Sequence, residues 1–159
     1  MNNRNAKELM TLYRLSDDDL KIIASFKPHF EKNRDQLVED WYKWLETTPE
    51  YAEFFEDPNV LKHAREQQTN YWSEFFKGVV DENYLDYRRK IGEIHARIGL
   101  PLEIYLAGVE YFSELILGIL VNSKLNSKKI YSLRIAVLKL TSIDMTTIVQ
   151  SYEAKKILI

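Results

Sequence analysis

The sequence contains no cysteine. Without thiols the chain forms no disulfide, no iron–sulfur cluster, and no metal centre that depends on a thiolate ligand. A protein without disulfides suits a reducing compartment, so we expect a cytoplasmic location. These absences remove whole classes of secreted, redox and zinc-binding proteins from consideration.

Glycine and proline are also scarce, at 5 and 4 of 159 residues. Strict alternation of apolar and polar residues, the pattern typical of half-buried strands, is absent as well. The length suffices for one domain with a sizeable core and is short for two. We therefore predict a single all-α domain that occupies residues 1–159.

The sequence has no strong excess of charge of one sign, because 22 Lys and Arg residues stand against 24 Asp and Glu residues. A nucleic-acid binder needs a concentrated basic face, which this balance does not offer. The most apolar run, residues 115–121, is far shorter than the ~20 residues that span a bilayer. The N-terminus lacks the apolar stretch of a signal peptide. We expect no nucleic-acid partner and no membrane partner.

Start and stop signals for helices divide the chain. Ser16 precedes three aspartates, and Asp57-Pro58 and Asp81 are further start signals, while Gly78 and Gly99 are stop signals. No repeat or linker is evident, so seven or eight helices with short connections are expected. Their predicted ranges are residues 5–14, 16–27, 28–46, 49–55, 59–77, 81–99, 101–122 and 128–159.

One histidine lies within an apolar helical stripe. Tyr84, Tyr87, Ile91, Ile94, His95 and Ile98 recur at steps of three and four residues. A buried imidazole needs a partner, since an unsatisfied buried polar group costs about 1–3 kcal/mol. Spacing alone leaves two interpretations open: a core histidine satisfied by a neighbouring group, or a metal ligand.

The helix predicted at residues 59–77 is expected to lie opposite the helix that carries His95. Its stripe consists of Val60, Ala64, Gln68, Tyr71 and Phe75, with Gln67 at the edge. Glutamines on such a face are either ligand contacts or partly exposed residues without a special role. Tyr42 is a further candidate, because a buried hydroxyl needs an acceptor. Gly92 within a helix indicates close approach by another helix or by a flat ligand.

No catalytic constellation is visible. The sequence shows no nucleophile with an adjacent base, no glycine-rich phosphate loop and no pair of carboxylates in a pocket. His29 and His63 lack the spacing of a zinc site. We therefore expect a domain that is not itself an enzyme.

The segment His95-Ala96-Arg97-Ile98-Gly99-Leu100-Pro101, together with Trp41-Tyr42 and residues 49–55, resembles the globin-coupled sensors. These are bacterial haem-based oxygen sensors in which a globin domain controls an output module. The resemblance extends over nearly the whole chain. It implies a globin-like fold, a haem b cofactor, and dioxygen, CO or NO as the ligand.

The resemblance also implies roles for individual residues. His95 would ligate the iron, and Tyr42 would donate a hydrogen bond to bound dioxygen. Tyr105 would hydrogen-bond the proximal histidine. Ala64 and Gln67 depart from the leucine and the hydroxyl residue that are frequent in the family, so either Gln67 or Gln68 would assist Tyr42. The remaining haem contacts are expected at Phe54, Tyr71, Ile91, Gly92 and Leu100.

The last two long helices carry apolar residues over much of their circumference, which predicts burial on several sides. We predict that they form a four-helix bundle across the two-fold axis of a homodimer; the alternative is that they complete the core of a monomer. The chain ends within a predicted helix, which favours truncation before an output domain such as a diguanylate cyclase. Two rival functions are a haem-free interaction module and a single-domain globin for gas storage.

Overall fold

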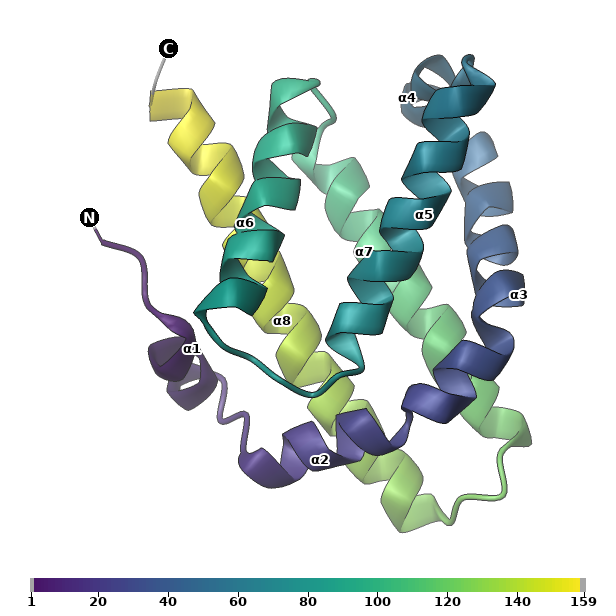
Figure 1. The fold of residues 1–159 in the computed structure, drawn as a ribbon, viewed down its shortest axis with the longest axis vertical. Coiled ribbons are helices and arrows are strands. Elements are labelled where there is room, and N and C mark those ends of the chain that lie inside the picture. Colours follow the sequence, from purple (N-terminus) through teal and green to yellow (C-terminus); the bar gives the residue numbers. More distant parts are fainter. Residues whose placement is uncertain (1, 158–159) are drawn as a thin grey trace.

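The computed structural model describes residues 2–157, which form eight α-helices and two short 3-10 helices and contain no strand (Figure 1). This confirms the predicted all-α architecture. The elements are α1 (Ala6–Leu12), α2 (Asp17–Ser25), α3 (Lys27–Glu46), α4 (Pro49–Ala52), η1 (Glu53–Phe55), α5 (Pro58–Phe75), α6 (Glu82–Arg97), α7 (Leu102–Ile119), η2 (Leu120–Asn122) and α8 (Ser127–Ile157).

Helix starts follow the sequence signals. The side chain of Ser16 accepts from the backbone N–H of Asp19, whose carboxylate accepts in turn from the backbone of Ser16. Asp81 caps α6 by accepting from the backbone of Tyr84. These caps satisfy backbone donors that have no partner within the first helical turn. They fix where α2 and α6 begin.

Helix ends depend on two glycines with left-handed backbone. Gly78 has φ of 66° and Gly99 has φ of 83°. After α6, the N–H of Gly99 donates to the carbonyl of Ala96, and that of Leu100 donates to the carbonyl of His95. This is a Schellman motif, in which glycine avoids the steric penalty of a positive φ. It turns the chain sharply immediately after the His95 helix.

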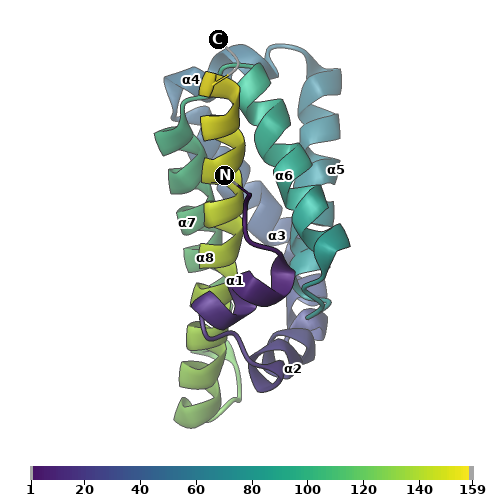
Figure 2. The same cartoon turned by 90° about the vertical axis from the view of Figure 1, so that its left-hand side faces the viewer.

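Contacts between helices hold the molecule together at several places. α6 packs chiefly against α8, and α3 packs against α7 and α5. The indole N–H of Trp41 donates to the carbonyl of Gly108 over 2.8 Å and joins α3 to α7. In the core, the rings of Trp72 and Phe112 stack with centroids 4.6 Å apart. Figures 1 and 2 show α8 running alongside both α6 and α7.

The buried face of α6 differs from the predicted stripe. The residues of α6 that pack into the core are Tyr84, Leu85, Arg88, Gly92 and Ala96. Ile94 and Ile98, which were expected on the core face, are 41% and 49% exposed. Of the six residues of the predicted stripe, Tyr84 alone is buried, so the predicted core face was wrong for most of its length. α8 packs instead on the side that carries Gly92 and Ala96, because small residues allow two helices to approach closely.

α7 is more apolar than the short run at residues 115–121 suggested. Among the described residues, Leu102–Asn122 is the one helix whose length and composition would suffice to cross a membrane. Core helices pass the same criterion, and this helix packs against α3 and α8. In its most apolar window 33% of the residues are fully buried, most of the other apolar residues are half-buried, and its exposed positions include Glu103, Glu110 and Glu114.

Candidate functional site

His95 is held in a defined orientation by its own helix. Its Nδ1 lies 2.8 Å from the carbonyl oxygen of Ile91, one turn earlier. A carbonyl only accepts hydrogen bonds, so Nδ1 carries the proton and Nε2 keeps its lone pair. Burial lowers the pKa of His95, against the opposing effect of the hydrogen bond to Ile91. The imidazole is therefore neutral at pH 7, with Nε2 available as a metal ligand.

Tyr105 of α7 contacts His95, although not as the resemblance implied. The two rings meet edge to face, with centroids 4.9 Å apart and an interplanar angle of 78°. The hydrogen bond of Nδ1 goes to Ile91 rather than to the phenol. Tyr105 thus limits rotation of the imidazole by packing, and the Ile91 carbonyl supplies the hydrogen bond expected of a second-shell partner.

Tyr42 is buried on α3, with an exposed fraction of 2%. Its ring packs edge to face against Phe55 at 5.8 Å, and the Arg65 guanidinium lies over it at 4.7 Å. Burial raises the pKa of Tyr42, so its hydroxyl keeps the proton. This hydroxyl forms no hydrogen bond with any other group of residues 2–157. The side chain is buried as a whole and its hydroxyl is a donor available to a ligand.

Tyr51 of α4 is buried and extends the aromatic group around Tyr42. Its ring stacks on Phe55 with centroids 6.0 Å apart, and Phe55 in turn packs against Tyr42. Next to His95, the rings of Tyr105 and Tyr152 have centroids 6.5 Å apart. Burial is the largest cause that raises the pKa of Tyr51 and of Tyr105, so both hydroxyls keep their protons.

The distal candidates on α5 occupy different environments. Ala64 and Gln68 are half-buried, whereas Gln67 is exposed. Neither glutamine hydrogen-bonds Tyr42 in the part of the chain described. The glutamine that assists Tyr42 stays a prediction, and the half-buried side chain of Gln68 is the better placed of the two.

Four other predicted contact residues lie as follows. Phe54 is half-buried, and the ring next to Tyr42 belongs to its neighbour Phe55. Leu100 is buried directly after the turn at Gly99. Gly92 faces α8, since a Cβ there would lie 2.8 Å from the Cβ of Ser151. Tyr71 is buried, and its hydroxyl donates to Asp144.

Three charged residues of this region escaped sequence reasoning. Arg65 bonds Glu39 over 2.9 Å while it covers Tyr42. Arg88 and Asp144 form an ion pair in the core. Charges in a helical pattern ordinarily indicate solvent, although Arg88 lies four residues from Tyr84 and from Gly92, and Asp144 lies four residues from Leu140 and from Ile148.

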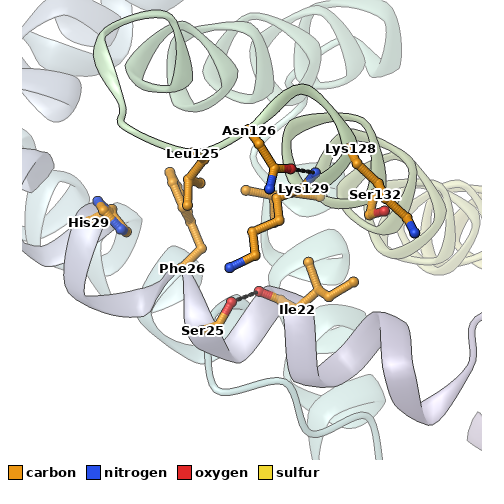
Figure 3. A pocket seen from close by; sticks show the side chains of 10 residues that line it. Ile22, Ser25, Phe26, His29, Leu125, Asn126, Lys128, Lys129 and Ser132 are labelled. Atoms are coloured by element: carbon orange, nitrogen blue, oxygen red, sulfur yellow. Dashed lines mark hydrogen bonds between the residues drawn. The ribbon is translucent and has the colours of Figure 1, made fainter.

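A separate cavity of about 550 Å³ lies at the start of α8, lined by side chains that include Phe26, His29, Leu125 and Lys129 (Figure 3). Neither His95 nor Tyr42 lines it. Its lysines are exposed and its floor is apolar. It is therefore unrelated to the His95 region.

The residues around His95 fit a porphyrin. No cluster of three or more His, Cys, Asp or Glu side chains that could hold a metal ion occurs among the described residues. One neutral imidazole suits a metal that brings its own ligands, as haem iron does. Ile91, Ile94 and Ile98 lie on the same side of α6 as His95 and remain partly exposed.

Fold and site together define an all-helical domain of the globin type. The chain belongs to the Protoglobin family, because the model of that family matches residues 2–157. It is similar in structure to the globin domain of the Geobacter sulfurreducens globin-coupled sensor, with a TM-score of 0.89 and 26% identity over 94% of this chain and 99% of that chain. The globin domain of E. coli DosC, in its ferric form, matches with a TM-score of 0.80 and 18% identity over 91% of this chain and 97% of that chain. These findings confirm the resemblance to globin-coupled sensor domains.

A curated relative extends the comparison to a complete protein. The heme-based aerotactic transducer HemAT of Halobacterium salinarum shares 31% identity over 104 residues. The match covers 64% of this chain and 21% of the relative. The chain therefore spans about a fifth of the length of that transducer.

Proposed function

We propose that this domain binds haem b through His95 and senses dioxygen for a signalling protein. One observation carries the proposal: Nδ1 of His95 donates to the Ile91 carbonyl, which leaves Nε2 as a neutral ligand on the partly exposed apolar side of α6. The similarity to the HemAT transducer and to a globin-coupled sensor domain supports it.

The residues of the chain would divide the work. Haem supplies the ferrous iron at which a diatomic gas binds. His95 holds the cofactor, and the Ile91 carbonyl and Tyr105 fix the orientation of the imidazole. Ile94 and Ile98 offer apolar surface to the porphyrin. Tyr42 donates to the gas ligand, with a preference for dioxygen because dioxygen accepts more negative charge than CO.

A homodimer is part of the proposal. Val121, Tyr131 and Leu138 are large side chains with mostly exposed surfaces near the end of α7 and on α8. Tyr131 and Leu138 are seven residues apart and so share one helix face. A second copy of the domain would cover this surface and the uncovered side of α7. A shift of α6 on ligand binding would then reach the interface through α8.

Two kinds of output module are compatible with this proposal. A diguanylate cyclase would follow the domain in one arrangement, and the aerotactic relative suggests a chemotaxis transducer in another. The first rival is a haem-free interaction module, which the available Nε2 of His95 disfavours. The second is a single-domain globin for gas storage, in which dioxygen would not affect the dimer.

Haem titration of the purified protein tests the proposal. We expect the wild type to give a five-coordinate ferrous spectrum in visible absorption and His95→Ala to lose it. His63→Ala is the matched control, since His63 is exposed on the neighbouring helix α5. Unchanged haem binding by a folded His95→Ala variant would refute the assignment.

A further inference from the structure

Two opposite charges lie in the core where α5, α6 and α8 meet. Arg88 is 0% exposed and Asp144 is 1% exposed, and Nε of Arg88 lies 3.2 Å from Oδ1 of Asp144. The hydroxyl of Tyr84 donates to the same Oδ1 over 2.7 Å, and that of Tyr71 donates to Oδ2 over 3.1 Å. We name these four residues the Asp144 cluster.

Stability alone is a poor reason for such a cluster. Removing ions from water is costly, and apolar residues of similar volume often serve a core equally well. In addition, Nε and Nη1 of Arg88 are both buried without a hydrogen-bond partner in the described chain, so its contact with Asp144 is an ion pair and not a hydrogen bond. An ion pair that leaves a donor unsatisfied stabilises the core less than a complete network. Directional bonds of this kind instead fix the relative placement of the helices that contribute them.

The cluster attaches α5 to the rest of the molecule through Tyr71. Besides the hydroxyl bond to Asp144, the backbone carbonyl of Tyr71 accepts from Nη2 of Arg88 over 2.9 Å. The Arg88 guanidinium also lies 3.6 Å from the centroid of the Tyr71 ring. Elsewhere α5 packs against α3, the helix that carries Tyr42. Tyr71 thus connects α5, which packs against the Tyr42 helix, with α6 and α8.

α6 and α8 are joined independently of the cluster. The hydroxyl of Ser151 donates to the carbonyl of Arg89 over 3.1 Å, and that of Tyr152 donates to the carbonyl of Leu100 over 2.9 Å. Gly92 allows the two backbones to approach closely at Ser151. Loss of the Tyr84 hydroxyl would leave these contacts in place, so α6 and α8 form one unit that carries His95.

We propose that Asp144 is a positioning residue for the haem site. Through Tyr71 it fixes the distal helix α5 to the α6–α8 unit, and so it sets the separation of the distal and proximal walls. The inference rests on the proposed haem function and adds to it a residue that touches neither haem nor gas. The hydroxyl of Tyr71 would link Asp144 to α5, whereas the hydroxyl of Tyr84, which donates to the same carboxylate, would not be needed for that link.

Tyr71→Phe and Tyr84→Phe form a matched pair for the test. Each variant removes one buried hydroxyl donor to Asp144 and keeps the aromatic ring. We expect Tyr71→Phe to increase amide hydrogen exchange in α5 at least tenfold and to change the dioxygen dissociation rate at least threefold. Tyr84→Phe should leave both within twofold of the wild type. Urea unfolding of each variant reports any difference in overall stability.

Equal changes in both variants, or no change in either, would overturn the positioning role. Hydrogen exchange is measured with and without added haem, which separates the two proposals. Selective loosening of α5 in a chain that binds no haem would retain the link from Asp144 to α5 and refute the haem function. Normal haem binding with unselective exchange would refute the positioning role alone.

Discussion

At the scale of single residues, a histidine is defined by what its two nitrogens contact. His95 donates through Nδ1 to a carbonyl of its own helix, and this bond fixes the tautomer. Because burial lowers its pKa, the folded protein binds the proton less readily than the unfolded chain does. We therefore expect the contribution of His95 to stability, and the proposed metal binding through its Nε2, to be present above about pH 6.5, the unperturbed value, and to be lost as pH falls below it.

Tyr42→Phe tests the distal donor. A hydrogen bond to a charged partner contributes about 1.5–3 kcal/mol, and each ~1.4 kcal/mol is tenfold in rate. We expect the dioxygen dissociation rate to rise at least tenfold and the CO dissociation rate to change little, as measured by stopped-flow spectroscopy. Tyr13→Phe is the control, because its hydroxyl bonds Thr146 instead. An unchanged dioxygen rate in Tyr42→Phe would remove Tyr42 from the site.

At the scale of elements, α6 presents two different faces. One face is formed by small or buried residues such as Gly92 and Ala96 and packs against α8. The other carries His95, Ile94 and Ile98 and stays partly open. Under the proposed function, close helix packing and haem binding would lie on different sides of one helix. A displacement of the haem-binding side would then be transmitted to α8 through the packed side.

Gly92→Ala measures how close that packing is. Alanine favours a helix interior by about 1 kcal/mol over glycine, but its Cβ would lie 2.8 Å from the Cβ of Ser151. Overpacking costs about 1–3 kcal/mol, so we expect Gly92→Ala to lower the free energy of unfolding in urea. Gly118→Ala in α7, where a Cβ meets nothing within 4 Å, should stabilise the protein slightly. Stabilisation by both variants would contradict the close contact between α6 and α8.

At the scale of the whole molecule, the helices of one chain do not cover all of its apolar surface. Tyr131 and Leu138 on α8 and Val121 beyond the end of α7 remain exposed, and several apolar side chains of α7 are only half-buried. Isolated exposed apolar residues are ordinary, but a continuous apolar helix surface marks an interface. A second copy that aligns its own α7 and α8 would complete a four-helix bundle.

Leu138→Glu tests that assembly. Leu138 is 60% exposed on α8, and a carboxylate there would be desolvated in the dimer and solvated in the monomer. We expect light scattering at micromolar protein to show the mass of a dimer for the wild type and of a monomer for Leu138→Glu. Val79→Glu, at an exposed position between α5 and α6, should keep the dimer. A monomeric wild type would contradict the dimer and would indicate that α7 and α8 only complete the core of one chain.

The sequence by itself determined the local structure of this protein. Capping residues such as Ser16 and Asp81 and the glycines after α5 and α6 specified where helices begin and end, because these signals act within one turn of backbone. The globin class was indicated by the resemblance of residues 95–101, Trp41-Tyr42 and residues 49–55 to a known family, whereas the spacing around His95 alone left a core histidine and a metal ligand as alternatives.

Only the tertiary structure decided which groups those helices bring together. The Ile91 carbonyl, rather than Tyr105, bonds His95, and the Asp144 cluster joins Tyr71 to α8. Arg88 and Asp144 are 56 positions apart, and each has the appearance of a surface charge in sequence. Burial and ion pairing depend on how helices pack over long sequence separations, and a local pattern carries no information about that packing.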